Sequence, residues 1–212
     1  MIINKTIFFL VSIFILIVHL RAMDFAYKTG LVYYNSEQPK KKDKVWDIIQ
    51  QNSNDYSVYN YTKNLYLIVF LFPLFVNYNV VLQSGFLKEF ISKFLIIVFL
   101  RSLTIISTIL PKNSSVQVKT DKNGNLSLFN KTIGGGGYDK MFSGHFAFGL
   151  LISLLLFKYN IVKTDGLNIF IFILLNILHF VILGITRSHY TMDMIVSLYV
   201  TLFVYNLNIQ II

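Results

Sequence analysis

The sequence predicts an all-α fold: a polytopic membrane protein built as a six-transmembrane-helix bundle. The first observation behind this prediction is composition, since 55% of the 212 residues are hydrophobic and only 14% are charged. Such a chain is too apolar for an ordinary soluble domain. The second is arrangement, because Ile, Leu, Phe and Val gather in runs of about 20 residues, the length that a helix needs to cross a bilayer. One bundle uses the whole chain, so residues 1–212 are expected to form a single membrane domain.

The first three spans are expected at about 2–20, 65–82 and 86–110. The basic start and apolar core of the first span are also typical of a signal peptide. The "RAMDFA" stretch that follows lacks a small-x-small cleavage pattern, which favours an uncleaved anchor. Pro73 is expected to kink the second helix, and Pro111 to end the third.

The other three spans are expected at about 141–157, 167–185 and 189–207. Polar stretches at about 21–64 and about 111–140 separate the earlier spans, and the second carries the turn signals "NGN" and "GGGG". Because successive spans alternate in direction, these two polar loops and the short connection at 186–189 share one face of the membrane. The connections at 83–92 and 158–166 share the other face with both termini.

We interpret the face of the two polar loops as lumenal or extracellular. These loops contain N-x-S/T glycosylation patterns, which begin at Asn60, Asn113, Asn125 and Asn130. A raw count of lysines would place the loops inside, but the positive-inside rule is weak for long loops. The short opposite connections also carry lysines, namely Lys88, Lys93, Lys158 and Lys163. The expected location is therefore an endomembrane or the plasma membrane, with the polar loops outside.

The net charge of +9 indicates contact with anionic lipid surfaces. Nucleic acid is the weaker alternative, because the lysines are spread over loops and no nucleic-acid-binding motif accompanies them. The sequence has no cysteine, which excludes thiol catalysis, disulfides and Cys-type zinc or iron–sulfur sites.

Three polar motifs flank helix ends on the face of the polar loops. The first, "SGH", opens the fourth span with His145; "RSHYTMD" opens the sixth with His189 and Asp193; and the outer half of the third carries Arg101. His189 and Asp193 are four residues apart and share one helix face. A carboxylate there can hydrogen-bond one ring nitrogen and leave the other with its lone pair outward. An ionised Asp193 at a span start is costly in lipid unless it is paired.

The two helix N-termini make this arrangement suited to a phosphoryl group. Ser143 is expected to cap the fourth helix, and Gly144 leaves room for an approaching group. Amides and positive dipole ends then point at one place. One histidine could attack phosphorus while the other protonates the departing oxygen and later deprotonates the incoming hydroxyl. Cationic side chains and amides can hold the equatorial oxygens, so no metal and no cofactor is expected.

These motifs resemble the sphingomyelin synthase and inositol phosphorylceramide synthase family, within the phosphatidic acid phosphatase type 2 superfamily. The family pattern C-G-D-x-x-[FY]-S-G-H-T appears as "GYDKMFSGHF", which matches at Asp139, Phe142, Ser143, Gly144 and His145. The second pattern, H-Y-[ST]-x-D-[VI], appears as "HYTMDM" and matches at His189, Tyr190, Thr191 and Asp193. The chain departs from the first pattern at the cysteine, the first glycine and the threonine, which are Gly137, Tyr138 and Phe146 here.

Weaker matches extend the resemblance over most of the chain. The arginine-to-proline motif appears as "RSLTIISTILP", from Arg101 to Pro111, and Arg187 is similar to the arginine of plant inositol phosphorylceramide synthases. An early aspartate motif has a weak counterpart in "DKVWDII", with Asp43 and Asp47. The wider superfamily has an arginine six residues before its second histidine, where this chain has Leu183. That difference argues for the sphingolipid branch.

The resemblance implies a metal-independent lipid phosphotransferase. A phospholipid donates its head-group phosphate, diacylglycerol leaves, and the hydroxyl of ceramide or a similar lipid accepts. By analogy, His189 is the nucleophile, Asp193 orients it and His145 is the acid–base partner. The candidate substrate-binding residues are Arg101, Arg187, Asp139, Ser143, Gly144 and Tyr190. A homo-oligomer is compatible with this interpretation.

Several of these residues could instead have a purely structural role. His145 alone could be a structural helix-end histidine, Arg101 could pair with Asp139 or Asp193, and Arg187 could snorkel to lipid phosphates. Asp43 and Asp47 are typical of a solvated helix face, and His19 and His179 of packing or interfacial positions. Two alternatives remain for the whole chain: a lipid phosphate phosphatase on the same site, and a non-catalytic membrane protein.

Overall fold

The computed structural model describes residues 2–3, 5–34, 68–110, 118–134, 137–185, 189–208 and 210–211. In that part of the chain the fold is helical apart from one pair of two-residue strands, β1 (Ile2–Ile3) and β2 (Gln210–Ile211), which run parallel. The helices are α1 (Lys5–Tyr34), α4 (Tyr78–Gln83), α5 (Phe86–Ser107), α6 (Gly144–Lys158), α7 (Gly166–Ile185) and α8 (Thr191–Tyr205). Residues 68–76 are helical as well, and Asn130–Gly134 form a π-helical turn. Six positions discussed above lie outside the described residues: Asp43, Asp47, Asn60, Pro111, Asn113 and Arg187.

The all-α prediction is confirmed, but the count of six spans is not. Each predicted span contains a helix, but Ile2–Ile3 form β1, and residues 108–110, 141–143 and 189–190 at the span ends are not helical. Judged by length and composition, three described helices could cross a membrane: α1, α5 and residues Gly166–Gly184 of α7. The helices α6 and α8 are apolar but have only 15 residues each. The molecule is therefore consistent with a membrane protein whose inner helices are short.

Two helix boundaries differ from the prediction. The helix at residues 68–76 continues through Pro73 and is interrupted at Asn77, whose backbone and side-chain amides both donate to the Pro73 carbonyl at 3.1 Å. The helix α1 does not end near residue 20 but continues to Tyr34. Its second half is helical because Ala22, Met23 and Ala26 are buried in a cluster with apolar residues from elsewhere in the chain.

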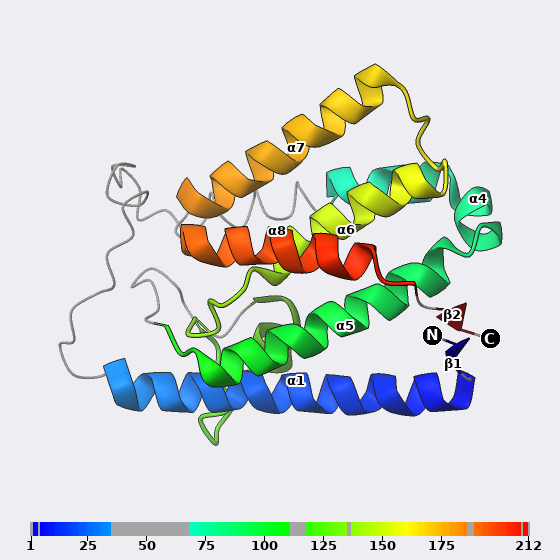
Figure 1. The fold of residues 1–212 in the computed structure, drawn as a ribbon. Coiled ribbons are helices and arrows are strands. Elements are labelled where there is room, and N and C mark those ends of the chain that lie inside the picture. Colours follow the sequence, from blue (N-terminus) through cyan, green and yellow to red (C-terminus); the bar gives the residue numbers. More distant parts are fainter. Residues whose placement is uncertain are drawn as a thin grey trace.

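The core lies between α5, α6 and α8, around Phe86, Ile97, Leu151, Leu155 and Val204. Figure 1 shows α1 lying along the outer side of α5, and α7 splayed outward on the other side of the molecule. The first residues of α6 and α8 lie at the same end of the bundle as the last residues of α1, α5 and α7 (Figure 1). Both chain termini lie at the opposite end. The motifs containing His145 and His189 therefore meet at one end, as six alternating spans require.

Candidate active site

His189 lies just before α8 and is fixed by the connection that leads into α6. Its Nδ1 is 2.9 Å from the backbone carbonyl oxygen of Lys140. Because a carbonyl oxygen only accepts hydrogen bonds, Nδ1 is the nitrogen that carries the hydrogen. The lone pair of a neutral ring is then at Nε2, the arrangement that a nucleophilic or basic imidazole needs. The ring is buried.

Asp193 plays a different part from the one that its spacing predicts. Its Oδ2 lies 3.7 Å from His189 Nδ1, which is longer than a hydrogen bond. The same oxygen accepts the backbone N–H of Tyr190 at 3.0 Å, at the first turn of α8. The Lys140 carbonyl thus accepts the hydrogen bond from His189 Nδ1 that was expected to go to Asp193. The carboxylate remains close enough to stabilise positive charge on the ring.

The first turns of α6 and α8 are joined directly. Ser143 caps α6 as predicted, since its hydroxyl accepts the Phe146 N–H at 3.3 Å. The Ser143 N–H donates to the Asp193 carbonyl at 3.4 Å. The hydroxyl of Ser197 lies 3.0 Å from the Ser143 carbonyl and 2.7 Å from that of Asp193. His145 lies in the first turn of α6, partly exposed, just after the Ser143 cap. Both histidine-bearing segments are therefore held at one place.

Arg101 reaches this place from α5 and clamps the connection before α6. Its Nη2 pairs with the Asp139 carboxylate at 2.7 Å and donates to the Asp139 carbonyl at 3.1 Å. Its Nε donates to the Phe142 carbonyl at 3.1 Å. A side chain at Gly144 would place its Cβ 3.2 Å from Cδ and Nε of Arg101. The room at Gly144 is thus occupied by Arg101, and the ion pair with Asp139, one of the alternatives above, is formed.

Two ionisable side chains in the connection before α6, Asp139 and Lys140, have shifted pKa values. Burial raises the pKa of the Asp139 carboxyl, but the charge and hydrogen bond of Arg101 outweigh it and bring the pKa down to about 2. Burial lowers the pKa of the Lys140 ammonium, against the opposing effect of Asp139 and Asp193. Ionisable groups with shifted pKa values are common at functional sites. Here two cations and two carboxylates lie within a buried polar centre.

The helix α1 and the loop at 118–134 flank this centre. Tyr138 stacks on Tyr34 with centroids 6.0 Å apart, and Tyr27 packs against it at 6.1 Å. On α1, the Asp24 carboxylate pairs with Lys131 at 2.5 Å and accepts the Leu126 N–H at 3.1 Å. The first half of α1 is tied to α5 by His19, whose Nδ1 lies 3.0 Å from the Ser102 hydroxyl.

The loop at 118–134 tests two predictions. The "NGN" turn is confirmed: Asp121 accepts the N–H groups of Asn123 and Asn125 at 2.8 and 2.9 Å, and Gly124 has a φ of +73°. The glycosylation pattern at Asn130 does not fit the folded chain. That side chain is buried, and its oxygen accepts from the Ser127 hydroxyl at 2.8 Å.

Sequence reasoning overlooked two residues of the site. Lys140 contributes both a backbone carbonyl to His189 and a buried ammonium. Ser197 joins the two helix starts, and its position one turn after Asp193 is the signal that could have revealed it. His179 packs between aromatic rings as expected, 5.7 Å from Phe70 and 5.8 Å from Phe146. Among the described residues, no group of three or more His, Asp or Glu side chains is arranged to hold a metal ion.

Comparison with known proteins points to the same region. Residues 138–210 match the family model described as the PAP2 superfamily C-terminal domain. The match covers about a third of the chain, and it contains both histidine motifs and Asp193. It supports the phosphatidic acid phosphatase type 2 superfamily and, in general terms, a lipid phosphatase or phosphotransferase. No curated protein and no solved structure matches the chain.

Proposed function

We propose that this protein is a lipid phosphotransferase that moves a phospho-head group from a glycerophospholipid to ceramide or a similar lipid alcohol. One observation supports the proposal: hydrogen bonds join the starts of α6 and α8, so that the segments carrying His145 and His189 lie together at one end of the bundle. The choice of ceramide rests on the resemblance of the motifs "YDKMFSGH" and "HYTMD" to the sphingomyelin synthase family.

In the first half of the reaction, Nε2 of His189 attacks the phosphorus of the donor. A P–N bond forms, the bond from phosphorus to the glycerol oxygen breaks, and diacylglycerol leaves with a proton from His145. The Lys140 carbonyl holds Nδ1–H throughout, and the Asp193 carboxylate at 3.7 Å offsets the positive charge that develops on the ring.

In the second half, the acceptor hydroxyl takes the place of diacylglycerol. His145 removes its proton, the oxygen attacks phosphorus, and the P–N bond breaks to restore His189. The backbone amides at the starts of α6 and α8 and the positive charge of Arg101 would stabilise the equatorial oxygens of phosphorus. In this proposal Arg101 acts through the connection that it clamps and through its charge, while Asp139 keeps it in place.

A lipid phosphate phosphatase is the second candidate, and the superfamily match favours it equally. The same groups would perform the first half of the reaction, and water would replace the lipid alcohol in the second. The two activities therefore differ only in the acceptor.

The test uses membranes that contain the protein, with ceramide and labelled phosphatidylcholine, phosphatidylethanolamine or phosphatidylinositol supplied together. The expected product is the phosphosphingolipid that matches one donor, and its formation should be lost in His189→Ala and His145→Ala. Tyr199→Phe, a change on the exposed side of α8, is the control that should retain activity. Phosphate release from phosphatidic acid without transfer to ceramide would favour the phosphatase. Full biological activity in His189→Ala would favour a non-catalytic protein.

A further inference from the structure

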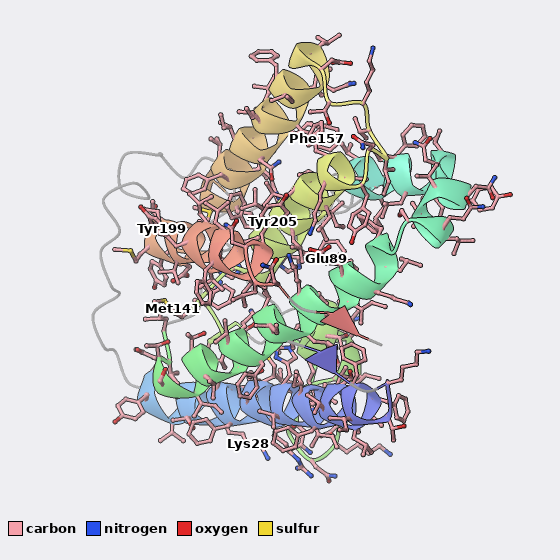
Figure 2. The ribbon with its side chains drawn as sticks, turned by 45° about the vertical axis from the view of Figure 1, so that its right-hand side comes forward. Lys28, Glu89, Met141, Phe157, Tyr199 and Tyr205 are labelled. Atoms are coloured by element: carbon pink, nitrogen blue, oxygen red, sulfur yellow. The ribbon has the colours of Figure 1, made fainter. Side chains whose placement is uncertain are left out.

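A second charged cluster lies at the end of the bundle opposite the candidate active site. Glu89 of α5 pairs with Lys93 at 2.5 Å and with Lys158 of α6 at 2.6 Å, and it accepts the Tyr159 hydroxyl at 2.5 Å. The Lys93 ammonium also donates to the carbonyl of Tyr205, the last residue of α8. Figure 2 shows Glu89 and Tyr205 where α5 meets α8. We call Glu89, Lys93 and Lys158 with these two tyrosines the Glu89 cluster.

Within the Glu89 cluster Lys158 is exposed, but Glu89 and Lys93 cannot move their charges toward water as surface lysines do. Lys93 is only 1% exposed and is held by both Glu89 and the end of α8. A free lysine on a helix end would snorkel to the interface. Here the Lys93 ammonium is fixed at the height in the bundle where α5, α6 and α8 meet. The apolar part of the core therefore ends at this height on one side.

The candidate active site marks the other edge. Arg101 follows Glu89 on the same helix by about three and a third turns, which corresponds to ~18 Å of rise. The helices α6 and α8 have 15 residues each, which gives each of them a length of ~22 Å. Both helices run from the active-site edge to the Glu89 cluster. The apolar layer of the core is thus about 18–22 Å thick.

The lipid-facing surface of α1 has nearly the same height. Its charged residues nearest to this surface are Lys5 and Arg21, which are ~24 Å apart along the helix. Between them the helix exposes large apolar side chains, including Phe9, Phe14 and Ile17. The hydrocarbon core of a typical bilayer is about 30 Å thick. With 20 residues, α7 is long enough to cross that distance, but it runs inclined to α8 (Figure 1).

We propose that this protein is built for a thin hydrocarbon layer, and that it binds short-chain lipids around it or thins a thicker bilayer. A bilayer can change its thickness at a modest cost for each ångström. Drawing the exposed charges that bound the apolar surface, Lys5 and Arg21 on α1 and Lys158 on α6, into hydrocarbon is far more costly. The lipid therefore adapts to the protein. The apolar surface of α1 and α8 is the interaction surface, and its partner is the bilayer itself.

This inference adds a route for the substrate, and that part rests on the proposed function. If the hydrocarbon edge lies at the level of Asp139 and Asp193, the phosphates of neighbouring lipids lie at the level of His189. A lipid could then reach the site by moving sideways in its own leaflet. No lipid would need to leave the membrane.

The test measures lipid binding and not catalysis, so it stands apart from the enzyme assay. Phe203 is exposed on α8, and Phe203→Trp in a Trp46→Phe background provides one lipid-facing tryptophan. Its quenching by brominated phosphatidylcholines of 14 to 22 carbons gives the relative binding of each chain length. We expect the tightest binding at 14 to 16 carbons, several-fold tighter than at 22. Equal binding at all lengths, or tightest binding at 20 or more, would overturn the proposal.

A matched set of variants tests whether the preference for short-chain lipids depends on the Glu89 cluster. Replacing Glu89, Lys93 and Lys158 together by leucine extends the apolar layer, so the tightest binding should move to longer lipid chains. Lys158→Arg keeps the charge and should leave the chain length of tightest binding unchanged. An optimum that stays at short chains in a folded triple variant contradicts the role of the cluster.

A depth measurement on the otherwise unaltered chain covers the case in which the triple variant does not fold. Because the chain has no cysteine, Met192→Cys gives a single spin label at an exposed position beside the site. The label should be accessible to a polar relaxing agent in both 14-carbon and 18-carbon vesicles. A label that lies within hydrocarbon in the 18-carbon vesicles shows that the bilayer does not thin, and refutes the proposal.

Discussion

Arg101 and Asp139 form a buried ion pair, 2.7 Å between Nη2 and Oδ2, that links the second half of α5 to the connection before α6. The same guanidinium donates to two carbonyl groups of that connection. A single side chain of α5 thus fixes the path of the chain from Asp139 to Phe142. The position of His145, which follows directly, depends on this clamp.

The first prediction concerns the pH dependence of this clamp. The pKa of Asp139 is lowered to about 2 in the folded protein, against about 3.9 in an unfolded chain. A carboxyl with a lowered pKa contributes stability that is present above pH 4 and is lost as the pH falls toward 2. At pH 7 Asp139→Asn should destabilise the detergent-solubilised protein by about 3 kcal/mol. Thermal unfolding should show this difference shrinking between pH 4 and pH 2, and a constant difference would contradict the prediction.

The second prediction concerns the contact between α1 and the site. A Cβ at Gly30 would lie 2.3 Å from the Tyr138 ring, so Gly30→Ala must displace that ring. Alanine normally stabilises a helix by about 1 kcal/mol relative to glycine, but the clash outweighs this gain and the melting temperature should fall. Gly166→Ala, with nothing within 4 Å of the new Cβ, should not lower it. Tyr138→Ala should remove the effect of Gly30→Ala, and independent effects of the two changes would show that the contact is not the cause.

The positions and order of the helices could be predicted because long apolar runs determine them, whatever they pack against. The sequence did not predict the length of α1, since Asp24 and Lys28 interrupt the apolar run after Arg21. This half of the helix is held by buried contacts of Met23 and Ala26. The count of six spans is not confirmed, because α6 and α8 are apolar but have only 15 residues each.

The residue types of the candidate site could be predicted from the sequence, but its hydrogen-bond partners could not. The spacing of His189 and Asp193 places them on one face, yet a backbone carbonyl contributed by Lys140 holds the ring. Every residue has such a carbonyl, so no sequence pattern reveals which one will be used. Likewise the glycine at 144 was correctly expected to allow a close approach, but the approaching group is Arg101 of the same chain.

The third prediction tests the link between the two helix starts. Ser197 is fully buried, and its hydroxyl lies within hydrogen-bond distance of the Ser143 and Asp193 carbonyls. Ser197→Ala should cost about 1–2 kcal/mol of stability, because a buried carbonyl loses its donor. It should also lower kcat more than it raises KM, since the relative position of His145 and His189 is disturbed. Ser107→Ala, at an exposed position of α5, is the control. Equal losses in the two variants would argue against a link.

The fourth prediction separates the charge of Asp193 from its role at the start of α8. In Asp193→Asn the side-chain oxygen can still accept the Tyr190 N–H, so the melting temperature should change little. The negative charge 3.7 Å from His189 is lost, and with it the stabilisation of the positive ring that forms on attack. We expect kcat to fall by about 10²–10⁴-fold, by analogy with the loss of an orienting carboxylate in other enzymes. Asp193→Ala should lose both stability and activity. A folded Asp193→Asn variant with unchanged kcat would show that the carboxylate serves only the helix start.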